Sequence, residues 1–349
     1  MEFGVFHEFQ CPAGQTEAGA FTESFAQVDA AEAWGLDVMW LAELHVAPGQ
    51  SVLAAPLTIA AAIAARTKRI KIGPAVQVLP LCHPLRLAEE ASTVDHISHG
   101  RLIFGVGRSG FPRTYEAYGV PYAESRDRFT ETLDIIKQAW TEPRFTYEGR
   151  FHSFKDVCLV PKPYQQPHPE IRIAATSPDT FPAIGAMGHG IFCAVRLGTF
   201  SELGPQIRAY RAARTAAGHP GQGKVFLRVP VYLAETERAA REEPEESILS
   251  FYRWLGNQLA DSAARSGARA IERRAERGQT LRTITYDDTL RDKVIIGTPS
   301  MVADKLAMLR EELGLDGILA ELNCGRAIPN ERVMNSLRLL CEEVIPKFR

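Results

Sequence analysis

The residues best suited to chemistry in this 349-residue chain stand directly after short apolar runs. Glu43 and His45 follow the apolar run 39–41, and His7 ends the apolar run 2–7. A carboxylate near an imidazole can orient the ring and support it as a proton acceptor. The alternative is that both side chains only satisfy backbone groups of a loop, where an unpaired charge would be costly.

A second group of residues has the chemistry of an anion site. GVGRSG (105–110) places Arg108 after a glycine-rich apolar run. The letters match G-x-G-x-x-G, but no helix opens at once and no acid ends the next strand about 20 residues on, so we do not predict a dinucleotide site. A guanidinium at a strand end, assisted by nearby backbone N–H groups, favours binding of an anion.

TSPDT (176–180) also follows an apolar run and precedes a helical pattern. Ser177, Asp179 and Thr180 are residue types that cap helices, so capping alone explains them. A helix N-terminus with hydroxyl and N–H groups also suits a phosphate, and Arg108 and Arg126 would help to balance its charge. Both interpretations stay open from these residues alone.

Other function classes find no support. His96 and His99 share a helical spacing without a third ligand nearby, so we predict no metal site. The six cysteines show no C-x-x-C or metal-ligand spacing, which indicates free thiols in a reducing cytoplasm. The net charge of −2 gives no reason to expect a nucleic-acid or membrane partner. No run is long enough to cross a membrane, and the start 1–9 does not resemble a signal peptide.

The elements that must position these residues alternate between strand and helix about eight times. This rhythm predicts an α/β protein of the (β/α)₈ TIM-barrel class, a single domain over 1–349 with insertions at about 143–170 and 240–297. The second insertion contains a basic segment, which is either a solvated helix and loop or a mobile lid. Catalysis in such a barrel takes place at the C-terminal ends of the strands, where the candidate residues stand.

The sequence resembles the bacterial luciferase-like flavin monooxygenases. The resemblance runs nearly from end to end and rests on the order and spacing of several motifs. These are WLAELH (40–45), VLPLCHPLRLAEEASTVDHISHGRLIFGVGRS (78–109), SRDRF (125–129), GTPSMVADKL (297–306) and EEVIPKF (342–348).

The resemblance implies an enzyme that binds reduced FMN, FMNH₂, in a TIM barrel. In this family the reduced flavin reacts with O₂ to form a C4a-peroxide and transfers one oxygen atom to a small or medium organic substrate. A separate NAD(P)H:flavin reductase usually supplies the flavin. The resemblance also implies a cytoplasmic homodimer.

The same resemblance assigns the cofactor residues. Arg108, Arg126, Ser177 and Thr180 fall on the family's phosphate-binding positions. A non-proline cis peptide that lies beside the flavin ring in the family falls on Ala75–Val76.

The catalytic residues depart from the family pattern. Many members read E-H-H after the tryptophan, but Leu44 takes the place of the first histidine. We therefore expect proton handling by His45 with Glu43, or by His7 or His83. Gly107 stands where the luciferases have a flavin-adjacent cysteine, which argues against light emission.

Three alternatives remain on the same barrel. One is a deazaflavin-dependent oxidoreductase that transfers hydride and does not use O₂. Another uses FMN with NADH directly. The third is a non-catalytic flavin-binding barrel, because a fold does not guarantee an activity.

Overall fold

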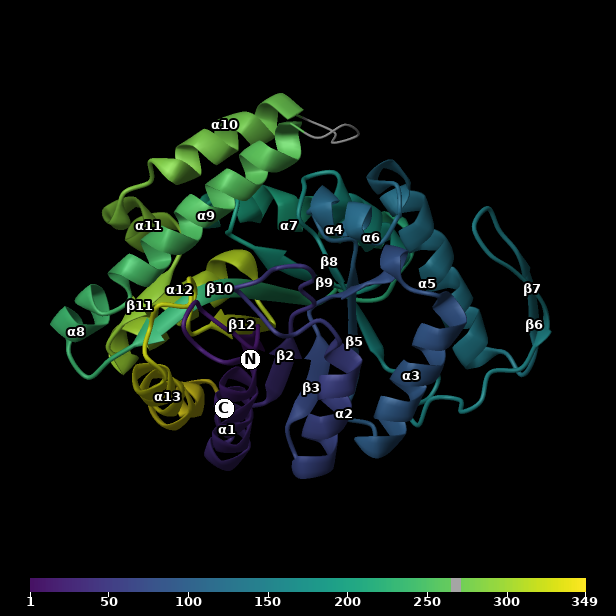
Figure 1. Cartoon of the computed structure of the whole chain (residues 1–349), viewed down its shortest axis with the longest axis horizontal. Coiled ribbons are helices and arrows are strands. Elements are labelled where there is room, and N and C mark those ends of the chain that lie inside the picture. The colour runs from purple at the N-terminus through teal and green to yellow at the C-terminus, as the bar shows by residue number, and fades with distance from the viewer. Residues whose placement is uncertain (265–270) are drawn as a thin grey trace.

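The short apolar runs of the sequence form the strands of a parallel barrel in the computed structural model of the chain (Figure 1). The structure describes residues 1–264 and 271–349. Hydrogen-bonded neighbours follow the order β3-β2-β1-β12-β10-β9-β8-β5-β4, and β11 pairs with β10. Because β3 and β4 are consecutive parts of one segment, the ends of the sheet meet and nearly close the barrel, which confirms the predicted fold class. The strands of this sheet are β1 (Glu2–His7), β2 (Val38–Leu41), β3 (Lys71–Pro74), β4 (Gln77–Val78), β5 (Ile103–Gly107), β8 (Glu170–Ala174), β9 (Gly190–Ala194), β10 (Val225–Leu233), β11 (Ile295–Gly297) and β12 (Gly317–Glu321).

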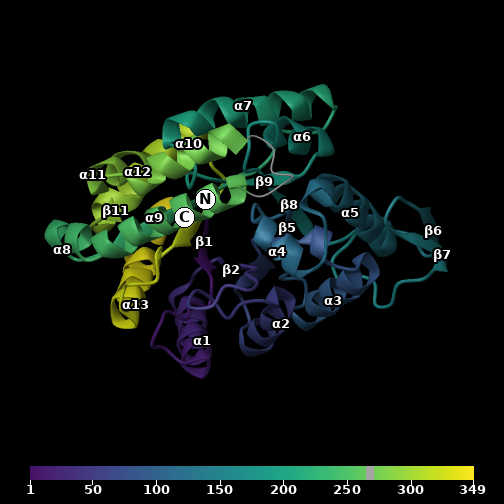
Figure 2. The ribbon, with the colours of Figure 1, turned by 45° about the horizontal axis from the view of Figure 1, so that its top comes forward.

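Helices surround this sheet and connect its parallel strands (Figures 1 and 2). Helix α1 shows how local sequence sets the bounds, since Thr16 caps its start and Gly35, with φ of 90°, ends it. None of the described helices is both long and apolar enough to cross a membrane. The connecting helices are α1 (Glu17–Trp34), α2 (Pro56–Arg66), η1 (Leu79–Leu81), α3 (Pro84–Ile97), α4 (Pro112–Ala117), η2 (Tyr122–Glu124), α5 (Ser125–Thr141), α6 (Thr180–Met187), α7 (Phe200–Ala216), α12 (Pro299–Leu313), α13 (Asn330–Leu339), η3 (Leu340–Val344) and η4 (Ile345–Phe348).

The two expected insertions contain regular structure, of which the sequence patterns indicated only a helix in the second. The segment 143–170 contains an antiparallel hairpin of β6 (Phe145–Glu148) and β7 (Ser153–Val157). The segment 240–297 contains helices and the short strand β11, and α9 lies along α10 (Figure 1). Residues 265–270 of the basic segment, for which we expected either a solvated helix and loop or a lid, lie outside the described part of the chain. The helices of this region are α8 (Glu237–Glu242), α9 (Glu245–Ala264), α10 (Ile271–Arg282) and α11 (Tyr286–Asp292).

A buried arginine fills the interior of the barrel near the N-terminal ends of the strands. Arg172 on β8 is 1% exposed, and its guanidinium lies 3.6 Å from the centre of the Phe226 ring. It pairs with Glu2 at 2.6 Å and with Glu170 at 3.1 Å. A buried guanidinium needs such partners, so these pairs fix the N-terminal ends of β1 and β8 relative to each other.

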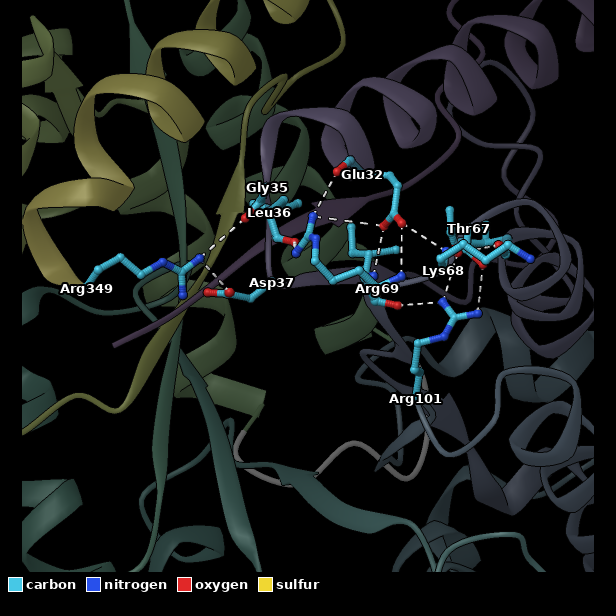
Figure 3. A network of polar contacts seen from close by, with 11 residues as sticks. Glu32, Gly35, Leu36, Asp37, Thr67, Lys68, Arg69, Arg101 and Arg349 are labelled. Atoms are coloured by element: carbon cyan, nitrogen blue, oxygen red, sulfur yellow. Dashed lines mark hydrogen bonds and ion pairs between the residues drawn. The ribbon is translucent and has the colours of Figure 1, made fainter.

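Polar side chains fasten the loops near the N-terminal ends of the strands (Figure 3). The Glu32 carboxylate accepts hydrogen bonds from the backbone N–H groups of residues 68–70, each at 2.9 Å. The Arg101 guanidinium donates to three backbone carbonyl oxygens within 64–70 at 2.8–3.1 Å. These contacts therefore hold the loops between α1, α2 and β5 in fixed positions.

We expect Arg101→Ala to lower the free energy of unfolding by about 3 kcal/mol, because four backbone carbonyl groups, that of Ser98 included, lose their donor. Arg66→Ala is the matched control, since it breaks the Arg66–Asp29 pair, whose side chains are 41% and 48% exposed, and a contact with the Phe25 ring, but no hydrogen bond to a backbone carbonyl. That control should lose less than about 1 kcal/mol. Urea unfolding of the two variants measures the difference, and equal losses would contradict a structural role for this network.

Candidate active site

The candidate residues gather at the C-terminal ends of neighbouring strands. Strands β4, β5 and β8 are consecutive in the sheet. Ala75 and Val76 directly precede β4, Arg108 follows β5, and Ser177 and Thr180 follow β8, whereas Arg126 lies at the start of α5. Glu43 and His45 follow β2, and His7 ends β1. In a barrel of this class these ends form the face where chemistry occurs.

Glu43 and His45 form a hydrogen-bonded pair. The His45 Nε2 lies 2.7 Å from Glu43 Oε1, and the two side chains are 9% and 2% exposed. The other carboxylate oxygen, Oε2, accepts from the Val78 N–H at 2.8 Å and from the Gln77 side-chain amide at 2.6 Å. Glu43 therefore fixes the position of His45 and ties the segment after β2 to strand β4.

Tyr118 completes this chain of contacts. Its hydroxyl lies 2.9 Å from His45 Nδ1, while the residue itself is 48% exposed. Since Nε2–H donates to the carboxylate, the neutral ring accepts at Nδ1 from the Tyr118 hydroxyl. A proton on His45 thus has a route through Tyr118 towards solvent. Sequence reasoning missed both Tyr118 and Gln77, because nothing in their local sequence indicates a contact with residues 43–45.

The break between β3 and β4 is a cis peptide bond at Ala75–Val76, which confirms the prediction of a non-proline cis bond there. Gly107 at the end of β5 lies against this segment. A Cβ atom at Gly107 would lie 2.4 Å from Val76 Cγ2. A glycine is thus needed for the close approach of β5 to Val76, and a cysteine at Gly107 would not fit without a shift.

Arg108 follows β5 and turns towards the start of α5. Its Nη1 donates to Ser125 Oγ at 3.3 Å, and its backbone carbonyl accepts from the Tyr115 hydroxyl. No described carboxylate forms an ion pair with Arg108. A guanidinium held only by a weak neutral contact has donors left for an anion.

Arg126, Ser177 and Thr180 meet at the start of α6, as the sequence predicted. Arg126 Nη2 lies 2.5 Å from the Asp179 carboxylate, which also accepts from Ser177 Oγ at 2.6 Å. Thr180 Oγ1 donates to the Ser177 carbonyl at 2.6 Å, so it holds the loop. Asp179, one of the residues expected to cap this helix, stands at the N-cap of α6, but its contact with Arg126 was not predicted, and it occupies donors that a phosphate would use. The hydrogen bonds from Ser177 and Arg126 lower the pKa of Asp179, so its carboxylate is ionised at neutral pH.

His7 lies apart from the Glu43–His45 pair and has both ring nitrogens engaged. Nδ1 accepts from the Phe9 N–H at 3.0 Å, and Nε2 contacts the Gln27 side-chain carbonyl at 2.9 Å. Burial lowers the pKa of His7 to about 4, against a smaller opposing effect of Gln27. These contacts give His7 a structural reason for its position. The other alternative, His83, accepts weakly from the Arg86 N–H at the start of α3.

His7→Asn tests this view of His7 through the pH dependence of stability. Above pH 6.5 the folded and unfolded states both hold a neutral ring, so titration contributes nothing. As the pH falls from 6.5 towards 4, the unfolded state takes up the proton first and the native protein loses stability. The wild type should lose about 2 kcal/mol relative to the variant midway through this window. Urea unfolding of both proteins across that pH range measures this difference in stability. An equal loss of stability in the two proteins would contradict the effect expected for His7.

Comparison with known proteins places this geometry in a class. The family model for luciferase-like monooxygenases matches residues 1–317. The chain is 25% identical over 352 residues to the oxygenase component of the flavin-dependent trigonelline monooxygenase of Acinetobacter baylyi, covering 100% of this chain and 96% of that relative. It is 30% identical over 218 residues to the F420-dependent glucose-6-phosphate dehydrogenase of Kineococcus radiotolerans, covering 60% of this chain and 63% of that one. The crystal structure of the monooxygenase RslO1 from Streptomyces bottropensis superposes with a TM-score of 0.80 and 28% identity, over 100% of both chains.

The chain belongs to the luciferase-like monooxygenase family. Its class is that of flavin-dependent oxygenases, as the resemblance in the sequence implied.

Proposed function

We propose that the protein is the oxygenase of a two-component system, which takes reduced FMN from a separate NAD(P)H:flavin reductase and oxygenates a small or medium organic substrate. The proposal rests on the anion donors at the ends of two consecutive strands. These donors lie next to the cis bond before a third strand and beside a buried histidine–carboxylate pair. The trigonelline relative, named as an oxygenase component, supports the need for a reductase. By the same family likeness we expect a cytoplasmic homodimer.

The residues present fit the phosphate of FMN. Arg108 and Arg126 supply guanidinium groups, and Ser177 and Thr180 supply hydroxyls beside the start of α6. Such a donor set suits a phosphate dianion. The Ala75–Val76 segment would lie against the flavin ring, and bound reduced FMN would supply the electrons that activate O₂.

His45 would handle protons for the reaction. Glu43 holds its ring in one orientation and stabilises the charge that it gains on protonation. Tyr118 connects Nδ1 with the exterior, so His45 can return a proton without opening the site. His45 thereby replaces the usual histidine, which Leu44 cannot provide.

Anaerobic titration with reduced FMN and with reduced deazaflavin tests the choice of cofactor. We expect tighter binding of FMN, and preferred binding of the deazaflavin would favour the hydride-transfer alternative that the Kineococcus relative represents. Oxidation of NADH by the purified protein with FMN alone would show that no reductase is needed. Flavin binding with no effect on its reaction with O₂ would favour the non-catalytic alternative.

Arg108→Ala should weaken FMN binding about thirtyfold, because one charge-assisted contact to phosphate is worth about 2 kcal/mol. Arg113→Ala is a matched control, since Arg113 is an exposed arginine on neighbouring α4. Fluorescence titration of FMN measures both variants. Unchanged affinity in Arg108→Ala would remove Arg108 from the site.

Asp179→Asn should tighten FMN binding about fivefold, because a phosphate would no longer displace a carboxylate from Arg126 and Ser177. The gain should shrink as salt rises, since these charges are exposed. Asp156→Asn is the control, because it disrupts a similar exposed pair with Arg144 on the hairpin. Weaker binding in Asp179→Asn would mean that its carboxylate positions Arg126 rather than competing with phosphate.

A further inference from the structure

A turn after β12 carries an arginine, Arg326, that lines a cleft at the barrel mouth. The cleft has a volume of about 480 Å³ and lies between the segments that follow β1 and β12. Strand β1 pairs with β2, which leads to Glu43 and His45. The cleft therefore belongs to the face of the proposed reaction, although its described lining contains none of the proposed cofactor residues.

The backbone of this turn is strained at Arg326. Its φ is 70°, in the left-handed region that is sterically unfavourable for a residue other than glycine. Gly325, with φ of 97°, precedes it, and a Cβ atom there would clash with the Ser247 carbonyl oxygen of α9. Close packing of the turn on α9 therefore requires Gly325. Strain at a residue that has a side chain is typical of functional sites.

Hydrogen bonds hold the turn in this conformation. The Asn323 side chain spans it, since Oδ1 accepts from the Ile328 N–H at 3.1 Å and Nδ2 donates to the Ile328 carbonyl at 3.0 Å. Ser247 Oγ donates to the Cys324 carbonyl at 2.8 Å and accepts from the Ala327 N–H at 3.0 Å. These bonds fix the position of the residue between 325 and 327.

An aromatic ring, rather than a carboxylate, places the guanidinium of Arg326. Its Cζ atom lies 5.5 Å from the centre of the Trp254 ring on α9. Among the residues that the structure describes, no carboxylate forms an ion pair with Arg326. A contact with a ring face leaves the N–H groups at the edge of the guanidinium available for an anion.

Two carboxylates also line the cleft, but each has a described partner. Glu8 pairs with Arg228 at 3.5 Å, so its charge is balanced. Glu23 is exposed on α1 and accepts from Gln15 Nε2 at 2.8 Å. Solvent screens an exposed carboxylate. The charge of Arg326 is therefore the one in the lining without a described counter-ion.

Apolar side chains form another part of the lining. Phe6, Leu322 and Ile328 all line the cleft, and they are 6%, 3% and 5% exposed. A cleft with an apolar wall and a small number of placed polar groups is typical of a site for a small organic molecule. The molecule that fits has an apolar part and an anionic group.

We propose that Arg326 binds the charged group of the substrate, and that this group is a carboxylate on an apolar body. The edge of a guanidinium matches a carboxylate, with which it forms two parallel hydrogen bonds. A neutral amide would place its own N–H group against these donors, and an ammonium group would be repelled by the Arg326 cation. This inference rests on the proposed function, because it names the substrate class of that enzyme.

Benzoate, benzamide and benzylamine are probes of one size that differ in this group. Anaerobic calorimetric titration of each into the protein loaded with reduced FMN should show benzoate binding at least about tenfold tighter than the other two. Tighter binding of benzamide or benzylamine, or no preference, would overturn the inference.

Arg326→Gln should weaken benzoate binding about tenfold and leave benzamide binding unchanged. Arg326→Lys should keep a preference for benzoate over benzylamine, because it keeps the charge. Arg332→Gln is the matched control, since Arg332 on α13 is 46% exposed and pairs with Glu243 at 3.6 Å. It should keep the benzoate affinity of the wild type. Unchanged benzoate binding in Arg326→Gln would remove Arg326 from the substrate site.

Arg326→Gly separates binding from a structural role. Glycine adopts the φ of this position without strain, which offsets the lost contact with Trp254, so the melting temperature should stay nearly unchanged. The preference for benzoate should disappear. A lower melting temperature together with unchanged benzoate binding would mean that Arg326 only completes the turn.

FMN affinity, measured for each protein by fluorescence titration, distinguishes this inference from the proposed function. It should be the same in Arg326→Gln and the wild type, and weaker binding in the variant would assign Arg326 to the cofactor instead. FMN binding without a preference for benzoate contradicts the inference alone. A preference for benzoate in a protein that binds no FMN supports the carboxylate site and contradicts the proposed function.

Discussion

The arrangement of the active face depends on a single buried carboxylate. Glu43 is 2% exposed, and a buried charge is tolerated only when hydrogen bonds compensate it. The Val78 N–H, the Gln77 amide and His45 provide these bonds. Because Val78 lies two residues after the cis bond, the same carboxylate that orients His45 also holds the segment proposed to contact the flavin ring. The proposed proton handling by His45 and the proposed position of the cofactor are therefore linked through one side chain.

Paired polar groups hold the segments at the N-terminal ends of the strands. Glu32 and Arg101 bond to backbone groups of the loops there, and Arg172 is paired with two carboxylates inside the barrel. Buried polar atoms without a described partner occur at both ends of the barrel, such as His189 Nε2 just before β9 and Glu321 Oε2 at the end of β12. The paired charges near the N-terminal ends therefore contribute to stability through compensated burial.

Strong local patterns and family motifs made a large part of the structure predictable from the sequence. Apolar runs located the eight principal parallel segments, and motif spacing located Arg126, Ser177 and Thr180, which the fold brings together. Partners that depend on tertiary contacts between distant segments were not predictable. Tyr118 meets His45 across 73 positions, and Asp179 meets Arg126 across 53. The hairpin of β6 and β7 was missed because its strands are largely exposed and lack an apolar pattern.

Rapid mixing of the protein loaded with reduced FMN with oxygenated buffer tests most directly whether the protein is an oxygenase. We predict that oxidised flavin appears after a delay much longer than for free reduced FMN, because a closed site with a positioned His45 slows unproductive oxidation. Oxidised flavin that appears at the rate of free flavin would contradict this prediction. The chain would then be a flavin-binding or hydride-transferring member of its family rather than an oxygenase.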